Sequence, residues 1–521
     1  MSFIIGLSDK EKNEISQIED DAGIQEEERG NRLKKSMISI KQTTPKKSSK
    51  TIFSIANTMM GSALLVMPIN FYNTGMLSGI ITALLMAYIS YKTCNLVILH
   101  SLPDEIDYPE AINRILGKKW EVFYNILSMI LLFLVGIIDF ILMAHGLYAI
   151  LKNVCDSSGW APEDKVSWDV FSLQYVGIII FVLCFIISFF EDLRIVLKIN
   201  DKGVYMIIIF CIYAIYLGIY GLVNYDFTYV VYGTPGKNNK GLEIVLFTYN
   251  IETLIGIFGL AYCVHNVANG IMKSNPQEFE QNTKDLKIAY SIVFILYVVL
   301  GVFGMFAVGY LYHTMYTDKI PETMMDLIVK SNPGMTQIQN IVGIASLILI
   351  FCQLTTVIPI LLFFTRRQFY NLFYSTGHKI NRWQFHAFNL AFNVSCLIIQ
   401  LCSLDPSMII SITGAVGGFF LIYVFPIFLH LKCLYFSKNV VTSSINIQNT
   451  EDNSNSYLSD KLVSNSQVND KKEDQVCVDH SKALKQNKIL VITFYIIIGM
   501  IGAGIMIIQF VKLFRKKETT A

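Results

Sequence analysis

Charged side chains are scarce in this sequence, and their scarcity excludes a soluble globular protein. Asp, Glu, Lys and Arg make up 16% of the 521 residues, whereas a soluble domain carries roughly 25%. Hydrophobic residues make up 53%, and they gather in successive runs of about 20 residues, the length that crosses a bilayer as a helix. The sequence therefore predicts an all-α polytopic membrane protein.

Sequence motifs of catalysis are also missing. The chain has no Walker-type loop, no G-x-S-x-G and no HExxH, so neither ATP-driven transport nor hydrolysis by this chain alone is supported. The ionisable residues within the apolar runs, such as Asp139, Glu252 and His430, are isolated from one another in the sequence. We therefore expect no enzyme, no cofactor and no metal site beyond a coupling ion. The ten cysteines include no CxxC pair and are expected to be free thiols, with a bridge between Cys155 and Cys402 as the alternative.

Eleven apolar runs are long enough to span a membrane. They cover residues 51–73, 77–99, 121–151, 174–190, 203–223, 246–271, 286–312, 338–365, 384–403, 408–435 and 488–512. The loops after the even-numbered runs carry most of the Lys and Arg residues, which predicts a cytosolic N-terminus by the positive-inside rule. The basic residues near the C-terminus oppose this orientation, but late charges weigh less than early ones.

Polar segments divide the chain into parts. Residues 1–50 are predicted to be a disordered cytosolic tail, and residues 51–435 a ten-helix transporter core. A disordered cytosolic linker at 436–487, an eleventh helix at 488–512 and a C-terminal tail at 513–521 are expected to follow. The membrane is expected to be the plasma membrane or a vacuolar or lysosomal membrane.

The middle of the first run is unsuited to a regular helix in lipid. Asn57, Thr58, Gly61 and Ser62 lie where a lipid-facing helix has Leu and Ile, and Pro68 removes a backbone donor. An opened turn survives in hydrocarbon only where protein or a cavity surrounds it. Its carbonyls can bind a cation, and the N–H groups of the next half-helix can bind a carboxylate. Alternatively, the small residues only allow a neighbouring helix to pack closely.

The sixth run has a second interruption. Gly256 and Gly259 lie in its middle, and the polar pair His265 and Asn266 follows. Ten runs divide into two sets of five, in which the sixth corresponds to the first. Transporters with inverted repeats break corresponding helices around a central site, so the two interruptions together predict such a site.

Two further runs carry polar residues that bear on transport. Thr355, Thr356 and Pro359 lie within two turns of the eighth run, and their hydroxyls and freed carbonyls are suited to an alkali cation. Alternatively, each hydroxyl bonds back to its own helix. Asp139 lies near the middle of the third run, where it is a candidate proton carrier or counter-charge. Its structural alternative is a protonated carboxyl bonded between helices.

Three stretches resemble the amino acid/auxin permease family of the LeuT-fold superfamily. They are Asn57–Pro68, Phe258–Asn266 and Phe351–Pro359. The run Gln-Leu-Thr-Thr-Val-Ile-Pro is especially similar to the sodium-coupled neutral amino acid transporter group and its lysosomal arginine-sensing member. The resemblance covers residues 51–435. It implies a 5+5 inverted repeat plus one helix, with helices 1 and 6 broken, that moves an amino acid by alternating access.

The resemblance also implies two binding sites at these breaks. Substrate is expected to contact peptide groups and aromatic side chains at Thr58, Gly61, Ser62, Phe258, Gly259 and Tyr262. A coupling cation, sodium or a proton, is expected at the carbonyls of Ala56, Met59 and Cys352 and the hydroxyls of Thr355 and Thr356. Met60 departs from the family pattern, because small residues are common at that position.

Two functions fit these features. The first is secondary active symport of an amino acid coupled to sodium or protons. The alternative is an amino acid sensor that signals through its cytosolic tail with little flux. The expected partners are the amino acid, the lipid bilayer and a cytosolic protein that binds the tail. No nucleic acid is expected, and the chain is expected to be a monomer.

Overall fold

The computed structural model describes most of the apolar part of the chain. The described residues are 48–157, 172–189, 193–274 and 277–434, with short gaps at 103–104, 106, 234–236, 239–240, 249–250, 315–322, 330–335, 375–380 and 403–405, and parts of 493–507. Most of the predicted tail, all of the predicted linker and the residues after 507 lie outside the described part. The segmentation into tail, core and linker therefore stays a prediction.

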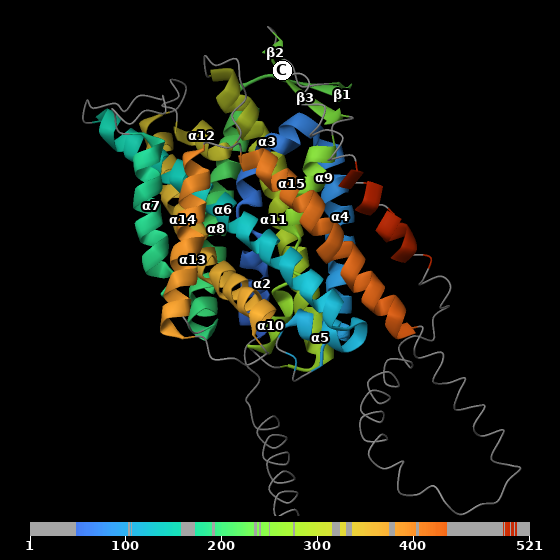
Figure 1. Ribbon diagram of the computed structural model, residues 1–521. Helices are drawn as coiled ribbons and strands as arrows, with labels where there is room; N and C mark the ends of the chain where they lie inside the picture. Colours follow the sequence, from blue (N-terminus) through green and yellow to red (C-terminus); the bar gives the residue numbers. More distant parts are fainter. Residues whose placement is uncertain are drawn as a thin grey trace, which may run out of the picture. The chain divides into compact units, whose positions relative to one another are not determined.

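The described chain is mostly helical (Figure 1). Its helices are α2 (Ser48–Met59), α3 (Ala63–Thr74), α4 (Met76–Leu99), α5 (Tyr108–Leu116), α6 (Lys118–Ser157), α7 (Leu173–Ile187), α8 (Leu193–Asn224), α9 (Glu252–Ala261), α10 (Ala268–Lys273), α11 (Phe279–Thr314), α12 (Met324–Val329), α13 (Gln337–Phe373), α14 (Arg382–Leu401) and α15 (Pro406–Gly418). A π-helix, η1 (Phe419–Val424), continues α15 without a break.

Several helices are long and apolar enough to cross a bilayer. Within the described residues six meet this criterion, and the pair α2 and α3 meets it together although the two helices are bent by 57° at their junction. Helices α7 and α9 are apolar but shorter. The described helices overlap all eleven predicted runs, with only fragments between 493 and 507 for the last.

A small sheet interrupts the helical chain, so the prediction of an all-α protein is wrong at this place. Strands β1 (Phe227–Tyr232), β2 (Lys237–Asn238) and β3 (Gly241–Phe247) lie between α8 and α9 in the order β1-β3-β2. β1 and β3 are parallel, and β2 is antiparallel to β3. The β-branched and aromatic residues of Phe-Thr-Tyr-Val-Val-Tyr favour a strand over the loop that their position between two apolar runs predicted.

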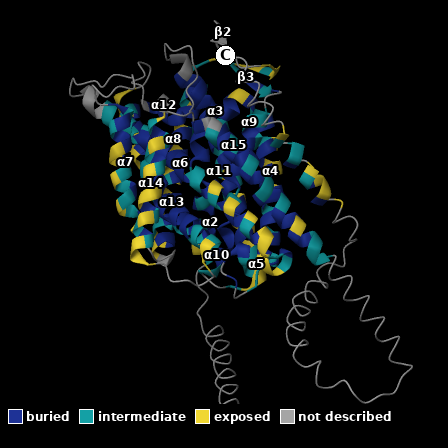
Figure 2. Cartoon of the chain, in the orientation of Figure 1, coloured by how far each residue is buried: buried dark blue, intermediate teal, exposed yellow. Residues whose placement is uncertain are grey.

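Polar side chains lie inside the helical assembly, and large apolar side chains lie outside. Asn57, Asp139 and His265 have no exposed surface. Exposed residues follow one side of α7 and α14 (Figure 2), and those of α7 include Ile178, Ile179, Val182 and Ile186. An apolar outer surface of this extent is stable in lipid rather than in water.

Helices α9 and α15 approach each other through glycine. A Cβ atom added to Gly414 would lie 1.9 Å from the carbonyl oxygen of Gly256, and one added to Gly259 would lie 2.8 Å from the carbonyl oxygen of Gly414. Both contacts are with backbone, so a side chain at either position would push the helices apart. Glycine therefore sets the distance between these two helices.

Candidate functional site between the α2–α3 and α9–α10 junctions

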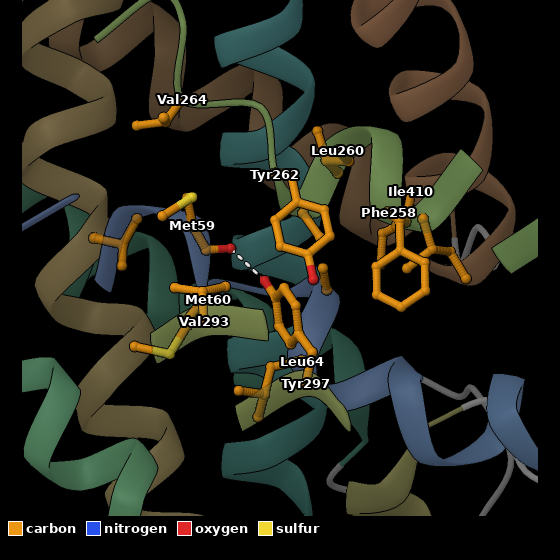
Figure 3. Close-up of a cluster of buried hydrophobic side chains, with 14 of the residues drawn as sticks. Met59, Met60, Leu64, Phe258, Leu260, Tyr262, Val264, Val293, Tyr297 and Ile410 are labelled. Atoms are coloured by element: carbon orange, nitrogen blue, oxygen red, sulfur yellow. Dashed lines mark hydrogen bonds between the residues drawn. The ribbon is translucent and has the colours of Figure 1, made fainter. Parts of the chain in front are cut away.

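The first junction lies between α2 and α3. Met59 ends α2 and Ala63 begins α3, with residues 60–62 between them. The Met59 carbonyl, which has lost its regular helical partner, accepts a hydrogen bond of 2.6 Å from the hydroxyl of Tyr297 on α11. Figure 3 shows this contact. A distant hydroxyl thus satisfies a carbonyl that the interrupted helix leaves free, as a buried environment requires.

The second junction lies between α9 and α10. The Tyr262 carbonyl accepts hydrogen bonds from the hydroxyls of Ser90 at 2.7 Å and Tyr290 at 3.0 Å. His265, also within this junction, has its Nε2 atom 3.0 Å from the hydroxyl of Thr93. Helix α4 and helix α11 therefore supply the polar groups that the interrupted backbone between α9 and α10 needs.

A small cavity of about 40 Å³ lies beside both junctions. Its walls come from residues within 58–63, 131–139, 260–267 and 357–361. A buried water needs about 10–15 Å³ on this measure, so the space holds a few waters and no free amino acid. The carboxyl of Asp139, which has no exposed surface, lines this cavity.

The cavity brings together one half of the predicted substrate residues. Thr58, Gly61 and Ser62 line it. Phe258 and Tyr262 are fully buried but do not line it. Their rings stack on each other at 5.6 Å between centroids, and the neighbouring Gly259 packs against α15. The assignment of all six residues to the substrate stays a prediction.

The predicted cation ligands lie between α2 and α13 and have protein partners. The Thr355 hydroxyl donates to the Phe351 carbonyl at 2.8 Å, and the Thr356 hydroxyl donates to the Gln353 carbonyl at 2.7 Å. The Ala56 carbonyl accepts from the Met60 N–H at 3.0 Å. Cys352, also on α13, is a half-buried free thiol. Each threonine hydroxyl thus bonds to a carbonyl of its own helix, which was the alternative to cation binding.

The sequence did not predict a set of hydrogen bonds from the Asn57 side chain that links α2 to α8 and α13. The Asn57 Nδ2 atom donates to the backbone carbonyl and the Oδ1 atom of Asn200, each at 2.7 Å, and lies 3.3 Å from the Thr356 hydroxyl. Asn200 precedes the predicted fifth run, so the sequence predicts that it lies in a basic loop. In the structure it belongs to α8 and is fully buried. Nothing in the local sequence distinguishes it from an exposed loop residue.

Comparison with known proteins decides the family. A profile of the family described as "Transmembrane amino acid transporter protein" matches residues 45–447, which is most of the chain. The chain belongs to this family. The transporter is therefore a multi-pass membrane protein rather than an enzyme.

Named relatives agree with this membership. The transporter is 25% identical over 444 residues to a protein of Caenorhabditis elegans named sodium-coupled neutral amino acid transporter 9 homolog, covering 73% of this chain and 68% of that protein. It is 24% identical over 435 residues to neutral amino acid transporter 9 of Rattus norvegicus, covering 73% of this chain and 72% of that protein.

Two solved structures show a more distant similarity. MhsT in complex with L-phenylalanine aligns with a TM-score of 0.47 and 12% identity, covering 71% of this chain and 87% of that chain. The inward-facing conformation of Mhp1 aligns with a TM-score of 0.46 and 12% identity, covering 72% of this chain and 76% of that chain.

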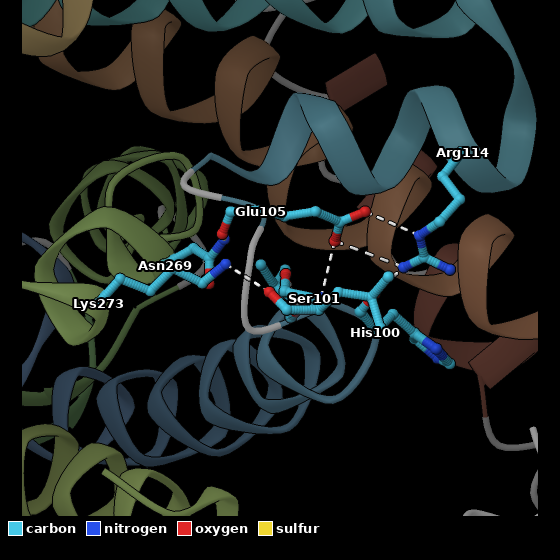
Figure 4. Close-up of polar contacts among 8 residues, drawn as sticks. His100, Ser101, Glu105, Arg114, Asn269 and Lys273 are labelled. Carbon is cyan, nitrogen blue, oxygen red and sulfur yellow. Dashed lines mark hydrogen bonds and ion pairs between the residues drawn. The ribbon is translucent and has the colours of Figure 1, made fainter. Parts of the chain in front are cut away.

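A second polar cluster in the transporter connects α4, α5 and α10 (Figure 4). The Arg114 guanidinium contacts the Glu105 carboxylate at 2.7 Å and the carbonyl of His100 at 2.7 Å. The ammonium of Lys273 on α10 donates to the Leu102 carbonyl at 2.5 Å. These bonds tie α10, the short helix after the second junction, to the segment between α4 and α5.

His430 and Glu252, the two other ionisable residues noted within the apolar runs, lie apart from the cavity. The His430 Nδ1 atom is 2.9 Å from the Nε2 atom of His100, so the two imidazoles connect α4 to the helix that follows η1. Glu252 begins α9. Neither residue is among those that line the cavity.

Asp107, beside this second cluster, gives the transporter a pH-dependent contact. Its carboxylate pairs with the guanidinium of Arg367 on α13 at 2.5 Å. Burial raises the pKa of the Asp107 carboxyl to about 6, although the Arg367 charge lowers it in part. A folded-state pKa above the unfolded value means that the folded protein binds this proton more tightly, so the contribution of Asp107 to stability is lost as pH rises through about 6.

We expect Asp107→Asn to remove this part of the pH dependence. Between about pH 4 and pH 6 the wild type should lose stability relative to the variant, by up to about 3 kcal/mol. Thermal unfolding of the purified protein in detergent at a series of pH values measures the difference. Glu280→Gln, which changes an exposed acid on α11, is the matched control. A wild-type and Asp107→Asn pair with parallel pH profiles would contradict the assignment.

Proposed function

We propose that this chain is a secondary active amino acid transporter that works by alternating access and couples uptake to sodium or protons. The observation that carries the proposal is the small cavity beside two interrupted helices in a chain of the transmembrane amino acid transporter family. The cavity is smaller than an amino acid, so α3 must move relative to α6 or α13 before substrate enters. Movement of this kind is what alternating access requires.

The proposed substrate site lies at the start of α3. Substrate carboxylate would bind there, near Gly61 and Ser62, because the first N–H groups of a helix attract anions. Thr58 would contact the substrate from the end of α2. The stacked rings of Phe258 and Tyr262 would form part of the site only after α9 and α10 shift. The names of the relatives favour a neutral amino acid.

The proposed sodium site lies between α2 and α13. Ala56 and Met59 would supply carbonyls from α2, while Cys352, Thr355 and Thr356 would supply oxygens from α13. The Asn57 amide now lies 3.3 Å from the Thr356 hydroxyl, so a cation there would replace an amide contact between the same two helices. The ion would then stabilise one arrangement of α2 against α13, which links its binding to the opening of the cavity.

The proposed membrane arrangement follows the sequence. Two inverted sets of five helices would form residues 51–435, and residues 488–512 would add an eleventh. The N-terminal tail would lie in the cytosol, at the plasma membrane or at a vacuolar or lysosomal membrane. Protease protection of tagged termini in intact cells and sealed organelles tests this orientation.

Uptake into proteoliposomes tests the function. Each of the twenty L-amino acids is supplied in radiolabelled form, with the sodium gradient and the pH gradient varied separately. Accumulation that requires a gradient supports coupled transport. Saturable binding without accumulation would instead support the sensor, and neither binding nor uptake would contradict both functions.

The Thr356→Ala variant tests the ion site. We expect the sodium concentration for half-maximal uptake to rise about tenfold, because the cation loses one oxygen ligand. Thr365→Ala is the matched control, since Thr365 is also a buried threonine of α13 that bonds back to its own helix, at 2.7 Å. Unchanged sodium dependence in Thr356→Ala would refute the ion-site assignment.

A further inference from the structure

Asp139 of α6 carries the one carboxyl group among the residues that line the cavity, as far as the structure describes them. It has no exposed surface. Its carboxyl faces both the hydroxyl and the backbone N–H of Ser62. Neither carboxyl oxygen has a partner of normal hydrogen-bond geometry. A buried acid in this state is costly, so its position needs an explanation beyond packing.

Ser62 is the N-cap residue of α3, at the end of the helix that attracts negative charge. Its hydroxyl does not cap its own helix. The N–H groups of Leu64 and Leu65 donate to the carbonyls of Gly61 and Ser62 at 3.2 Å each. The hydroxyl and N–H of Ser62 therefore face the cavity with the positive end of the helix dipole behind them. Asp139 has its carboxyl at the place that we propose for the carboxylate of the substrate.

Two ionised carboxylates are not stable together at this place. No Lys, Arg or His side chain lines the cavity among the described residues, so no basic group neutralises the second negative charge. Like charges a few ångströms apart in a buried site force one group to bind a proton. Water screens the charges only weakly, because the cavity is small and Asp139 has no exposed surface.

The other titratable groups around Asp139 are thiols. Cys184 of α7 and Cys396 of α14 are close enough to interact with its charge, and Cys263 lines the same cavity. The described parts of α2, α3, α9 and α13 that border the cavity present no titratable side chain to it. A thiol ordinarily keeps its proton below about pH 8.5, so Asp139 is the one group of this set that can take up a proton when a second carboxylate binds between pH 5.5 and pH 7.5.

We propose that Asp139 takes the place of the substrate carboxylate in the empty transporter, and that an amino acid replaces it only together with one proton. The proton comes from the aqueous phase and binds a carboxyl oxygen of Asp139. The neutral acid leaves the Ser62 donors, which then bind the carboxylate of the substrate. This inference rests on the proposed function. It adds a proton site that is separate from the proposed sodium site.

Binding measurements at several pH values test the proposal. The twenty L-amino acids are screened by thermal stabilisation of the purified full chain in detergent, and the tightest binder is then titrated at pH 5.5, 6.5 and 7.5. For the wild type we expect affinity to rise as pH falls, by up to about tenfold per pH unit. Asp139→Asn should bind at pH 7.5 as tightly as the wild type binds at pH 5.5. Cys184→Ser should keep the wild-type pH dependence.

A second measurement, of proton uptake by the wild type, does not require the Asp139→Asn variant. In weakly buffered solution with a pH indicator, the wild type should take up one proton per bound amino acid at pH 7.5. The amine that lacks the carboxylate of the same amino acid should bind without proton uptake. These measurements stay decisive even where Asp139→Asn fails to fold.

Three results would overturn the inference while leaving transport intact. They are wild-type binding without proton uptake, pH dependence that persists in Asp139→Asn, and binding that weakens at low pH and is lost in Asp139→Asn. The last would make Asp139 the counter-charge of the substrate's amino group. Binding of none of the twenty amino acids at any pH would instead refute the proposed function itself.

Discussion

Replacement of Gly61 by leucine is expected to abolish amino acid binding. Gly61 lines the cavity, and a Cβ atom at this position would lie 3.9 Å from the Oδ1 atom of Asp139. That contact is an ordinary one, so the first carbon fits. The three further carbons of leucine would occupy most of this small space, where we propose that the substrate binds. We expect a loss of affinity of more than about hundredfold.

Gly61→Ala is the matched control for this variant. Its single methyl group makes only the ordinary contact with Asp139, so most of the binding should remain. Titration of the purified variants with the tightest-binding amino acid measures both affinities, and size-exclusion chromatography shows whether each variant is folded. Wild-type affinity in Gly61→Leu would count decisively against a substrate site at this junction.

Replacement of Gly414 by alanine is expected to destabilise the whole helical assembly. The new Cβ atom would lie 1.9 Å from the Gly256 carbonyl oxygen and 2.8 Å from the Leu260 nitrogen. Both are backbone atoms of α9, so no side-chain rotation relieves the overlap and the two helices must separate. Overpacking of a core commonly costs 1–3 kcal/mol, and a backbone overlap of this size should cost about 3 kcal/mol or more.

Gly499→Ala provides the control for Gly414→Ala. A Cβ atom at Gly499 meets nothing within 4 Å, so this variant changes a glycine in an apolar helix without a steric effect. The thermal midpoint in detergent and the monodisperse fraction measure the two effects. Equal midpoints for Gly414→Ala and the wild type would show that α9 and α15 do not pack as described.

The sequence predicted the helical regions well because their signal is local. Runs of apolar residues identify a helix that lies in lipid wherever they occur, and the described helices overlap all eleven runs. The small sheet between α8 and α9 was not predicted, since short strands outside the bilayer carry a much weaker pattern. The parallel pairing of β1 with β3 also depends on contacts between strands.

The junction at Gly61 and Ser62 was predictable for a similar reason. Small and polar residues in the middle of an apolar run disturb regular helical bonding where they lie, and the structure interrupts the helix there. The partners of that junction were not predictable. Tyr297, which bonds to the Met59 carbonyl, lies 238 residues further along the chain.

The contacts around the proposed cation site were also not predicted, because they join residues that are far apart in the sequence. Asn200 bonds to Asn57 across 143 residues of chain. A buried asparagine and an exposed loop asparagine look alike in a single sequence, because burial depends on which helices pack together. Asp139 was singled out by its depth in an apolar run, but its approach to Ser62 depended on how α6 lies beside the junction between α2 and α3.

The amino-acid sequence was enough to predict that this is a membrane protein and that most of it is helical. It was also enough to predict where the first apolar run loses regular helical hydrogen bonding. These properties follow from the transfer of side chains and peptide groups into lipid, which each segment experiences separately. The tertiary structure alone decided which hydroxyls satisfy the open carbonyls, how much space remains between the helices, and which acid faces the start of α3. Each of these depends on atoms that only folding brings within a few ångströms of each other.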